Sequence, residues 1–182
     1  KMQIDKIVTG ILEENCYVLH QNHTCLLIDP GSDFKKIKEK IGNDKILGVF
    51  VTHVHFDHIG ALRDFLNENH RLKVFKKSNL ADGQVMTIGD FTLQAIYTPG
   101  HSSDSVSYYF ESDNCMFTGD FIFKDTVGRC DLPTGSEEAM DISLKRLSVY
   151  PDSLALYPGH GDETTLAIEK KNNLYLQAVL KA

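Results

Sequence analysis

The chain has 182 residues, of which 42% are hydrophobic, enough to build a sizeable core. Its formal net charge is -6 and it contains no block of basic residues, which argues against a nucleic-acid partner. No apolar run approaches the ~20 residues that a membrane-spanning helix needs, and the first residues form no hydrophobic signal segment. We therefore expect a single domain over residues 1–182, located in the cytoplasm, without membrane or nucleic-acid partners.

The first half of the chain alternates short strands with helices. Strands are predicted over 4–8, 16–20 and 25–29, followed by a helix over 33–41 with Asp33 as its N-terminal cap. A strand of the buried type over 46–51 leads into a turn rich in histidine and aspartate. Apolar positions at helical spacing then predict a helix from about Asp57 to Asn67.

The middle and second half continue the same mixture of elements. A strand over 72–75 and a hairpin over 84–97 precede strands over 105–110 and 115–118. A helix is predicted over 137–149, a strand over 154–157, and helical segments after His160. Leu144, Leu147 and Leu174 are predicted to face the core because of their helical spacing. Since no linker or repeat divides the chain, we expect helices covering a core of two sheets.

Cysteines and isolated histidines carry no metal-site pattern of their own. Cys16, Cys25 and Cys115 lie in strand-like segments and are predicted to be buried thiols in a reducing cytosol, while Cys130 lies in a loop. The three histidines without a motif are predicted to be solvated surface residues; they are His20, His23 and His70.

The run Thr52-His53-Val54-His55-Phe56-Asp57-His58 is the strongest chemical signal in the chain. Imidazole nitrogens and a carboxylate are good ligands for a divalent ion such as zinc, and this many cannot pack into an apolar core without a shared cation. In an extended turn His53 and His55 point the same way and can reach one ion. Asp57 and His58 lie one step further along and can reach a second ion.

Three further candidate ligands follow strand-like runs. His101 and His160 each come directly after a Pro-Gly turn, and Asp120 follows a strand and a glycine. Proline and glycine end a strand and let the chain bend, which exposes the next side chain at the rim of a sheet. We therefore predict that these three residues complete the metal site.

This ordered set of seven ligands resembles the metallo-β-lactamase superfamily, and most nearly its glyoxalase II-like members, over essentially the whole chain. The resemblance implies an α+β fold, a four-layer αβ/βα sandwich of two mixed sheets flanked by helices, with the site at one edge. It further implies that His53, His55 and His101 hold one metal and that Asp120 bridges both metals. The remaining ligands of the second metal would be Asp57, His58 and His160.

The resemblance also implies a reaction. Two divalent ions, with zinc as the default and iron or manganese as alternatives, would provide a metal-bound hydroxide that attacks a thioester carbonyl. Asp57 and Asp120 would be the catalytic carboxylates, acting mainly as ligands. A thiolate leaving group, with a pKa of about 8.5 for a simple thiol, needs little help from a general acid. The expected partner is a small-molecule thioester, and the oligomeric state stays open.

The loop after Asp120 should carry substrate specificity. Glyoxalase II typically has a basic residue there and a tyrosine two residues later; here Arg129 fits the first position, but Asp131 replaces the tyrosine. Only 22 residues follow His160, so the family's C-terminal helical domain is not expected, and glutathione is in doubt as the thiol. Arg129 and Asp131 would either touch substrate or brace the loop as an ion pair.

The main alternative is a persulfide dioxygenase, which resembles this chain through the same ligands and the Gly-Arg-x-Asp loop. Such an enzyme would use one iron held at the positions of His53, His101 and Asp120. Against it, the chain has Gly159-His160-Gly161-Asp162 where those enzymes usually carry Ala-His-Asp-Tyr. A β-lactamase, a nuclease, a flavodiiron module and a scaffold without activity are further from the observed pattern.

Overall fold

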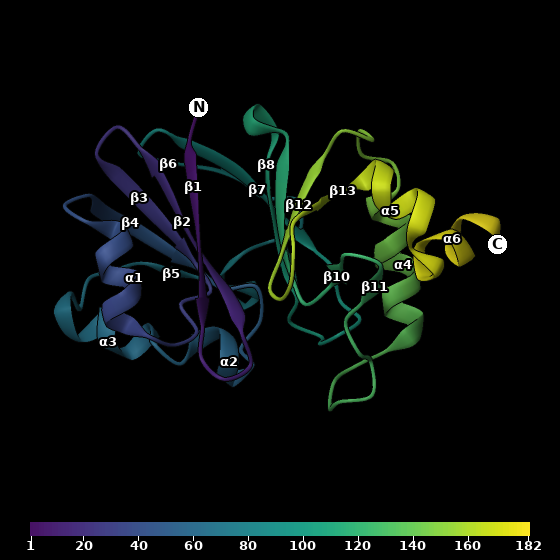
Figure 1. Cartoon of the computed structure of the whole chain (residues 1–182), viewed down its shortest axis with the longest axis horizontal. Helices are drawn as coiled ribbons and strands as arrows, with labels where there is room; N and C mark the ends of the chain where they lie inside the picture. The colour runs from purple at the N-terminus through teal and green to yellow at the C-terminus, as the bar shows by residue number, and fades with distance from the viewer.

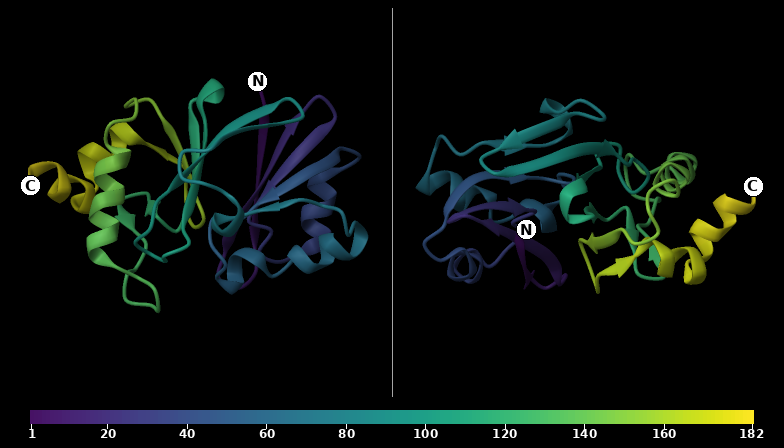
Figure 2. Two further views of the ribbon diagram at one scale, coloured as in Figure 1. Left: turned by 180° about the vertical axis from the view of Figure 1, so that it is seen from behind. Right: turned by 90° about the horizontal axis from the view of Figure 1, so that it is seen from above.

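Two β-sheets packed face to face form the centre of the molecule in the computed structural model, which describes residues 1–182 (Figure 1). Helices cover the outer face of each sheet, so that four layers follow one another (Figure 2). No helix has the length and apolar character needed to span a membrane. The arrangement confirms the predicted α+β sandwich of two sheets flanked by helices.

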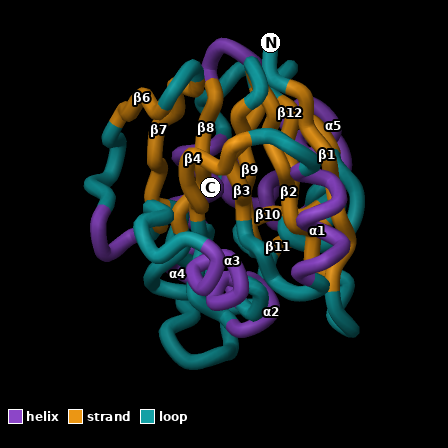
Figure 3. The backbone as a smooth tube through the Cα atoms, turned by 90° about the vertical axis from the view of Figure 1, so that its left-hand side faces the viewer, coloured by secondary structure: helices purple, strands orange, loops and turns teal.

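The first sheet comes from the N-terminal part of the chain and is mixed. Its strands lie in the order β1 (Gln3–Thr9), β2 (Glu14–Gln21), β3 (Thr24–Ile28), β4 (Lys45–Phe50) and β5 (Val74–Phe75). The first three strands pair antiparallel and the last three parallel. Helices α1 (Phe34–Ile41) and α3 (Leu62–Glu68) cover its outer face, as seen from that side in Figure 3. The short helix α2 (Phe56–Ile59) follows β4.

The second sheet is mixed as well. From one edge to the other its strands are β13 (Thr164–Thr165), β12 (Ala155–Pro158), β9 (Cys115–Gly119), β8 (Val106–Phe110), β7 (Phe91–Tyr97) and β6 (Val85–Ile88). Strands β12 and β9 pair parallel and the other neighbours antiparallel. Its outer face packs on α4 (Glu137–Leu147), α5 (Leu166–Asn172) and α6 (Leu174–Lys181). A small hairpin of β10 (Ile122–Phe123) and β11 (Thr126–Val127) lies beside it.

The alternation of side chains along the strands explains the layers. In β2, Tyr17 and Leu19 enter the cluster between the two sheets, whereas Cys16 and Val18 enter the cluster beneath α1 and α3. Successive side chains of a strand point to opposite faces, so a strand buried on both faces must be apolar throughout. A third cluster, between the second sheet and the C-terminal helices, completes the core.

Several predicted details are wrong. The helix predicted to run from Asp57 to Asn67 is interrupted between α2 and α3, where Gly60 packs so closely that an added Cβ would lie 2.3 Å from the Gly31 carbonyl oxygen. Asp33 occupies the N-cap position of α1, as predicted, but its side chain makes no capping hydrogen bond: its backbone is left-handed, and its carboxylate accepts instead from Gly10 N at 2.9 Å. Leu174 is 74% exposed, unlike the buried Leu144 and Leu147.

For the cysteines and histidines predicted to lie outside the site, most predictions of burial are confirmed and one is wrong. Cys16, Cys25 and Cys115 are buried free thiols, as predicted. His23 and His70 are exposed, also as predicted. His20 is not solvated: its two ring nitrogens lie 2.9 Å and 2.6 Å from carboxylate oxygens of Asp5 and Asp44, which approach from β1 and from the loop before β4.

Candidate metal centre

Segments that leave four strands meet at one edge of the sandwich. The histidine-rich turn follows β4, and His101, Asp120 and His160 follow β7, β9 and β12. Backbone hydrogen bonds hold these segments together, since Val106 N donates to Thr52 O at 2.8 Å and Gly159 N donates to Gly119 O at 2.8 Å. The edge therefore gathers residues that are more than 100 positions apart in the chain.

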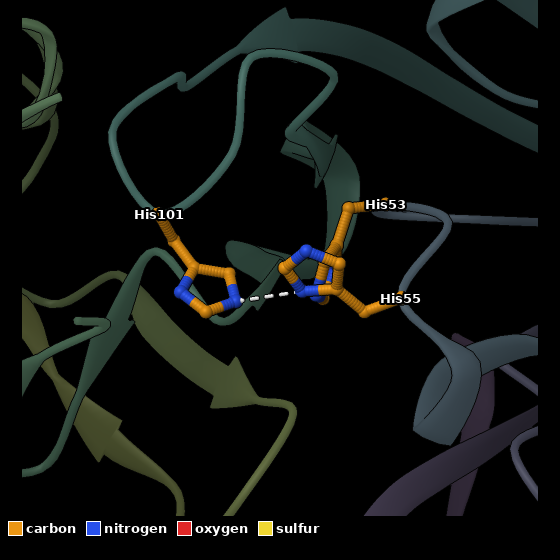
Figure 4. Close-up of side chains that lie close together, drawn as sticks. All are labelled: His53, His55 and His101. Carbon is orange, nitrogen blue, oxygen red and sulfur yellow. Dashed lines mark hydrogen bonds between the residues drawn. The ribbon is translucent and has the colours of Figure 1, made fainter. Parts of the chain in front are cut away.

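Three imidazoles form the first group. One ring nitrogen from each of His53, His55 and His101 lies within 4.8 Å of the others. Figure 4 shows His53 and His55 arriving from the turn after β4 and His101 from the opposite side, with His55 Nδ1 and His101 Nε2 3.1 Å apart. At most one of these two facing nitrogens can carry the proton between them, which leaves a lone pair pointing into the group.

The second group lies next to the first and adds carboxylates. Ligand atoms of Asp57, His58, Asp120 and His160 lie within 4.8 Å of one another. His160 Nε2 is 3.0 Å from Asp57 Oδ2, and His58 Nε2 is 3.1 Å from Asp120 Oδ1.

Asp120 faces both groups. Its Oδ1 atom belongs to the second group, whereas its Oδ2 atom lies 3.5 Å from His101 Nε2 and 3.7 Å from His53 Nε2 in the first. A carboxylate that presents a different oxygen to each group has the geometry of a bridge between two ions.

Unpartnered atoms show that the groups fit a cation. His53 Nε2, His58 Nε2 and Asp120 Oδ1 are buried and make no hydrogen bond within the protein. Leaving a buried polar atom without a partner costs about 1–3 kcal/mol, so three in one place require an explanation. A divalent ion that accepts nitrogen and oxygen ligands, such as zinc, iron or manganese, would satisfy all three.

A buried carboxylate orients the histidine turn from behind. Asp29, which follows β3, accepts hydrogen bonds from Thr52 N at 2.7 Å, Thr52 Oγ1 at 2.6 Å and His58 Nδ1 at 2.7 Å. Because the Nδ1 atom of His58 is engaged in this way, its Nε2 atom points into the second group. Sequence reasoning missed Asp29, although it ends a strand next to a Pro-Gly pair: it precedes Pro30-Gly31, whereas His101 and His160 follow theirs.

Backbone carbonyls orient two other rings. His101 Nδ1 donates to Arg129 O at 2.8 Å, and His160 Nδ1 donates to Leu12 O at 3.1 Å. Each bond leaves the Nε2 atom of that ring facing the site, and it selects the tautomer that a metal ligand requires.

Burial and neighbouring charges shift the pKa values of histidines in the two groups in opposite directions. Burial lowers the pKa of His53 to about 2, so this ring is neutral at pH 7. Burial also opposes the charged form of His160, but the neighbouring carboxylates of Asp120 and Asp57 raise its pKa to about 10. The carboxylates of Asp29 and Asp120 likewise outweigh burial and raise the pKa of His58. An ion entering the second group must therefore displace protons.

Comparison with known proteins identifies the family. Residues 9–70 and 76–160 match the model of the Metallo-beta-lactamase superfamily. The chain belongs to the metallo-β-lactamase superfamily. Among its relatives, the probable metallo-hydrolase YqgX of Bacillus subtilis is 31% identical in an alignment covering 96% of this chain and 98% of YqgX. The hydroxyacylglutathione hydrolase GloC of Haemophilus influenzae is 25% identical, and the alignment covers 97% of this chain and 99% of GloC.

Several solved structures share the fold closely. The BLEG-1 B3 metallo-β-lactamase has a TM-score of 0.87 at 27% identity, covering 96% of this chain and 99% of its own. TTHA1623 in a di-iron-bound form has a TM-score of 0.84 at 29% identity, covering 94% of this chain and 99% of TTHA1623. ETHE1 from Myxococcus xanthus also has a TM-score of 0.84, at 27% identity, covering 95% of this chain and 84% of ETHE1.

The predicted substrate residues of this superfamily member lie beside the donor groups, not among them. Arg129 Nε and Nη2 donate to the two Asp131 oxygens at 2.7 Å and 2.9 Å, and both side chains are exposed. This ion pair lies at a cavity of about 730 Å³ that is also lined by Glu137, Asp141 and the half-buried Cys130. The only contact of Arg129 with the site is its backbone carbonyl, which holds His101.

Proposed function

We propose that this chain is a dinuclear metal-dependent hydrolase of the glyoxalase II type, which cleaves a small-molecule thioester in the cytoplasm. The observation that carries the proposal is the pair of adjoining donor groups that Asp120 faces with different oxygens. The relatives support the same reaction class, because they include a probable metallo-hydrolase and a hydroxyacylglutathione hydrolase.

The residues divide the work in this proposal. His53, His55 and His101 would hold one ion, Asp57, His58 and His160 the other, and Asp120 would set the spacing between them. Two divalent ions bound there would supply a water of lowered pKa as nucleophile and stabilise charge on the thioester carbonyl oxygen. Asp57, whose Oδ2 lies 3.0 Å from His160 Nε2, would keep that ring in place. Zinc is the metal we propose; the di-iron form of TTHA1623 makes iron the first alternative.

Metal content and activity together test the proposal. We expect close to two equivalents of divalent metal per chain by elemental mass spectrometry, and hydrolysis of S-lactoylglutathione or another thioester. Asp120→Ala should lose most of the activity, at least ~100-fold, together with part of the metal, because the bridge is gone. The exposed histidine variant His23→Ala is the matched control and should retain both. Full metal and full activity in Asp120→Ala would refute the assignment.

A persulfide dioxygenase is the second candidate, favoured by the similarity to ETHE1. One oxygen of Asp120 lies near both His53 and His101, which is the trio that a single iron would use. One equivalent of iron, with oxygen uptake in the presence of glutathione persulfide and no thioester hydrolysis, would establish this activity instead. A cephalosporin belongs in the same assay, since BLEG-1 is a β-lactamase.

A further inference from the structure

An apolar rim surrounds part of the metal centre. Ile11 and Leu12 form the tip of the hairpin between β1 and β2, and their exposed fractions are 99% and 61%. Phe56, between two candidate ligands, is 83% exposed. Phe123 of β10 is half-buried. These four residues, the apolar rim, come from three separate segments of the chain.

Direct contacts place the rim at the centre. His160 Nδ1 donates to the Leu12 carbonyl oxygen at 3.1 Å, which ties the hairpin tip to a candidate ligand. The ring of Phe123 lies 6.0 Å from the ring of His160 in an edge-on arrangement. Phe56 begins α2, whose next two residues, Asp57 and His58, belong to the second donor group. The rim therefore lies on the side of the centre that holds this second group.

The first donor group adjoins a cavity of mixed polar and apolar lining, because His101 Nδ1 donates to the backbone carbonyl of Arg129 at the edge of this cavity. There the ion pair of Arg129 and Asp131 borders the cavity that Glu137 and Asp141 also line. Asp131 engages the Nε and Nη2 atoms of Arg129 and so neutralises much of the charge that this arginine could offer to an anionic ligand. A ligand that spans the centre thus meets the apolar rim beside the second donor group, and beside the first group a cavity whose lining includes Asp131, Glu137 and Asp141.

We infer that the apolar rim receives the acyl group of the substrate, and that this group is an aliphatic chain. The inference rests on the proposed function, in which the thioester carbonyl lies at the metal centre. From that carbonyl the acyl chain and the thiol leave in different directions. Covering three exposed large hydrophobic side chains is favourable in proportion to the apolar area buried, and an aliphatic chain removes that area from water without needing a polar partner.

A series of thioesters that share one neutral thiol, N-acetylcysteamine, tests the inference on the metal-loaded protein. From acetyl through butyryl and hexanoyl to octanoyl, kcat/KM should rise about two- to threefold per methylene, somewhat below the value for full burial. The binding of S-methyl and S-octyl thioethers of the same thiol, measured by calorimetry, should follow the same order without depending on turnover.

Variants of the rim should reduce this selectivity. Ile11→Ser, at a fully exposed position that is not next to any candidate ligand, should lower the octanoyl-to-acetyl ratio of kcat/KM by about fivefold, and Ile11→Ser/Phe56→Ser by more than tenfold. The control is Ile142→Ser: Ile142 is 64% exposed on α4, and its loss should leave the ratio unchanged.

The outcomes separate the two claims. A kcat/KM that stays flat or falls from acetyl to octanoyl would overturn the inference and leave the proposed hydrolase standing. The same holds if kcat/KM rises along the series but the rim variants do not change that rise. No hydrolysis of any thioester, with the thioethers still ranked by chain length in calorimetry, would overturn the proposed reaction but keep the rim as an apolar binding surface.

Discussion

Single residues at this metal centre are placed by backbone geometry as much as by their own chemistry. Gly159 shows why His160 needs a particular neighbour. A Cβ added at position 159 would lie 2.6 Å from Asp120 Oδ1 and 2.6 Å from His58 Cε1, in the second donor group. Gly161, on the other side of His160, has a left-handed backbone (φ of 80°) but open space around it.

We therefore predict different consequences for two alanine variants of this loop. In the proposed two-metal site, Gly159→Ala should weaken binding of the ion in the second donor group at least tenfold, because the methyl group displaces Asp120 or His58. Gly161→Ala should cost about 1 kcal/mol of folding free energy through backbone strain and leave both metals bound. Metal titration of the two purified variants distinguishes them, and equal metal affinity in both would contradict the steric account.

At the scale of elements, the two sheets are joined where the centre lies. Tyr108 of β8 is fully buried, and its hydroxyl donates to the carbonyl oxygen of Val51, at the end of β4, at 2.6 Å. Burial raises the pKa of this phenol well above its ordinary value, so it is protonated and a donor at neutral pH. The bond links one sheet to the segment that begins the histidine turn of the other.

Removing this link should destabilise the whole fold. Tyr108→Phe leaves the Val51 carbonyl without its shortest bond, which should lower the free energy of unfolding by about 1–2 kcal/mol and the Tm by roughly 3–6 °C. Thermal unfolding followed by circular dichroism measures the loss. Tyr175→Phe, at a side chain that is 55% exposed, is the control and should change the Tm by less than about 2 °C.

For the molecule as a whole, the donor groups connect its two halves. Four of the seven candidate ligands belong to the turn after the first sheet, and the other three follow strands of the second. A bound ion would therefore cross-link the two layers at their shared edge, and its binding free energy would add to the stability of the folded state.

Metal removal should lower the Tm, and the pKa values give the sign of the pH dependence. At ion concentrations a thousandfold above Kd the gain is about 4 kcal/mol, or on the order of 10 °C. His160 has its pKa raised from 6.5 to about 10, so between these values its proton stabilises the metal-free fold progressively less as pH rises, and an ion displaces it more readily.

The difference in Tm between metal-loaded and chelated protein should therefore grow from pH 6 to pH 9. Differential scanning calorimetry at several pH values measures it directly. His53, with a pKa of about 2, adds no such dependence in this range. A difference that shrinks as pH rises would show that proton displacement from His160 does not control binding.

The sequence alone predicted those features that depend on residues close together in the chain. Period-two and helical patterns identified most strands and helices, and Pro-Gly and glycine turns marked His101, Asp120 and His160 as strand-end residues. The resemblance, carried by ordered motifs, then indicated which sheets and layers these elements would form. That part was predictable because hydrophobic periodicity and turn chemistry are local properties of the chain.

Only the tertiary structure could decide the contacts between distant segments. Asp29 and Glu14 lie behind the histidine turn because β2 and β3 pack beneath it, and burial there raises the pKa of Glu14 to about 9. The pairing of His20 with Asp5 and Asp44 likewise depends on strand register. Which polar residues become buried, and with which partners, is determined by the packing of whole layers, and no local pattern encodes it.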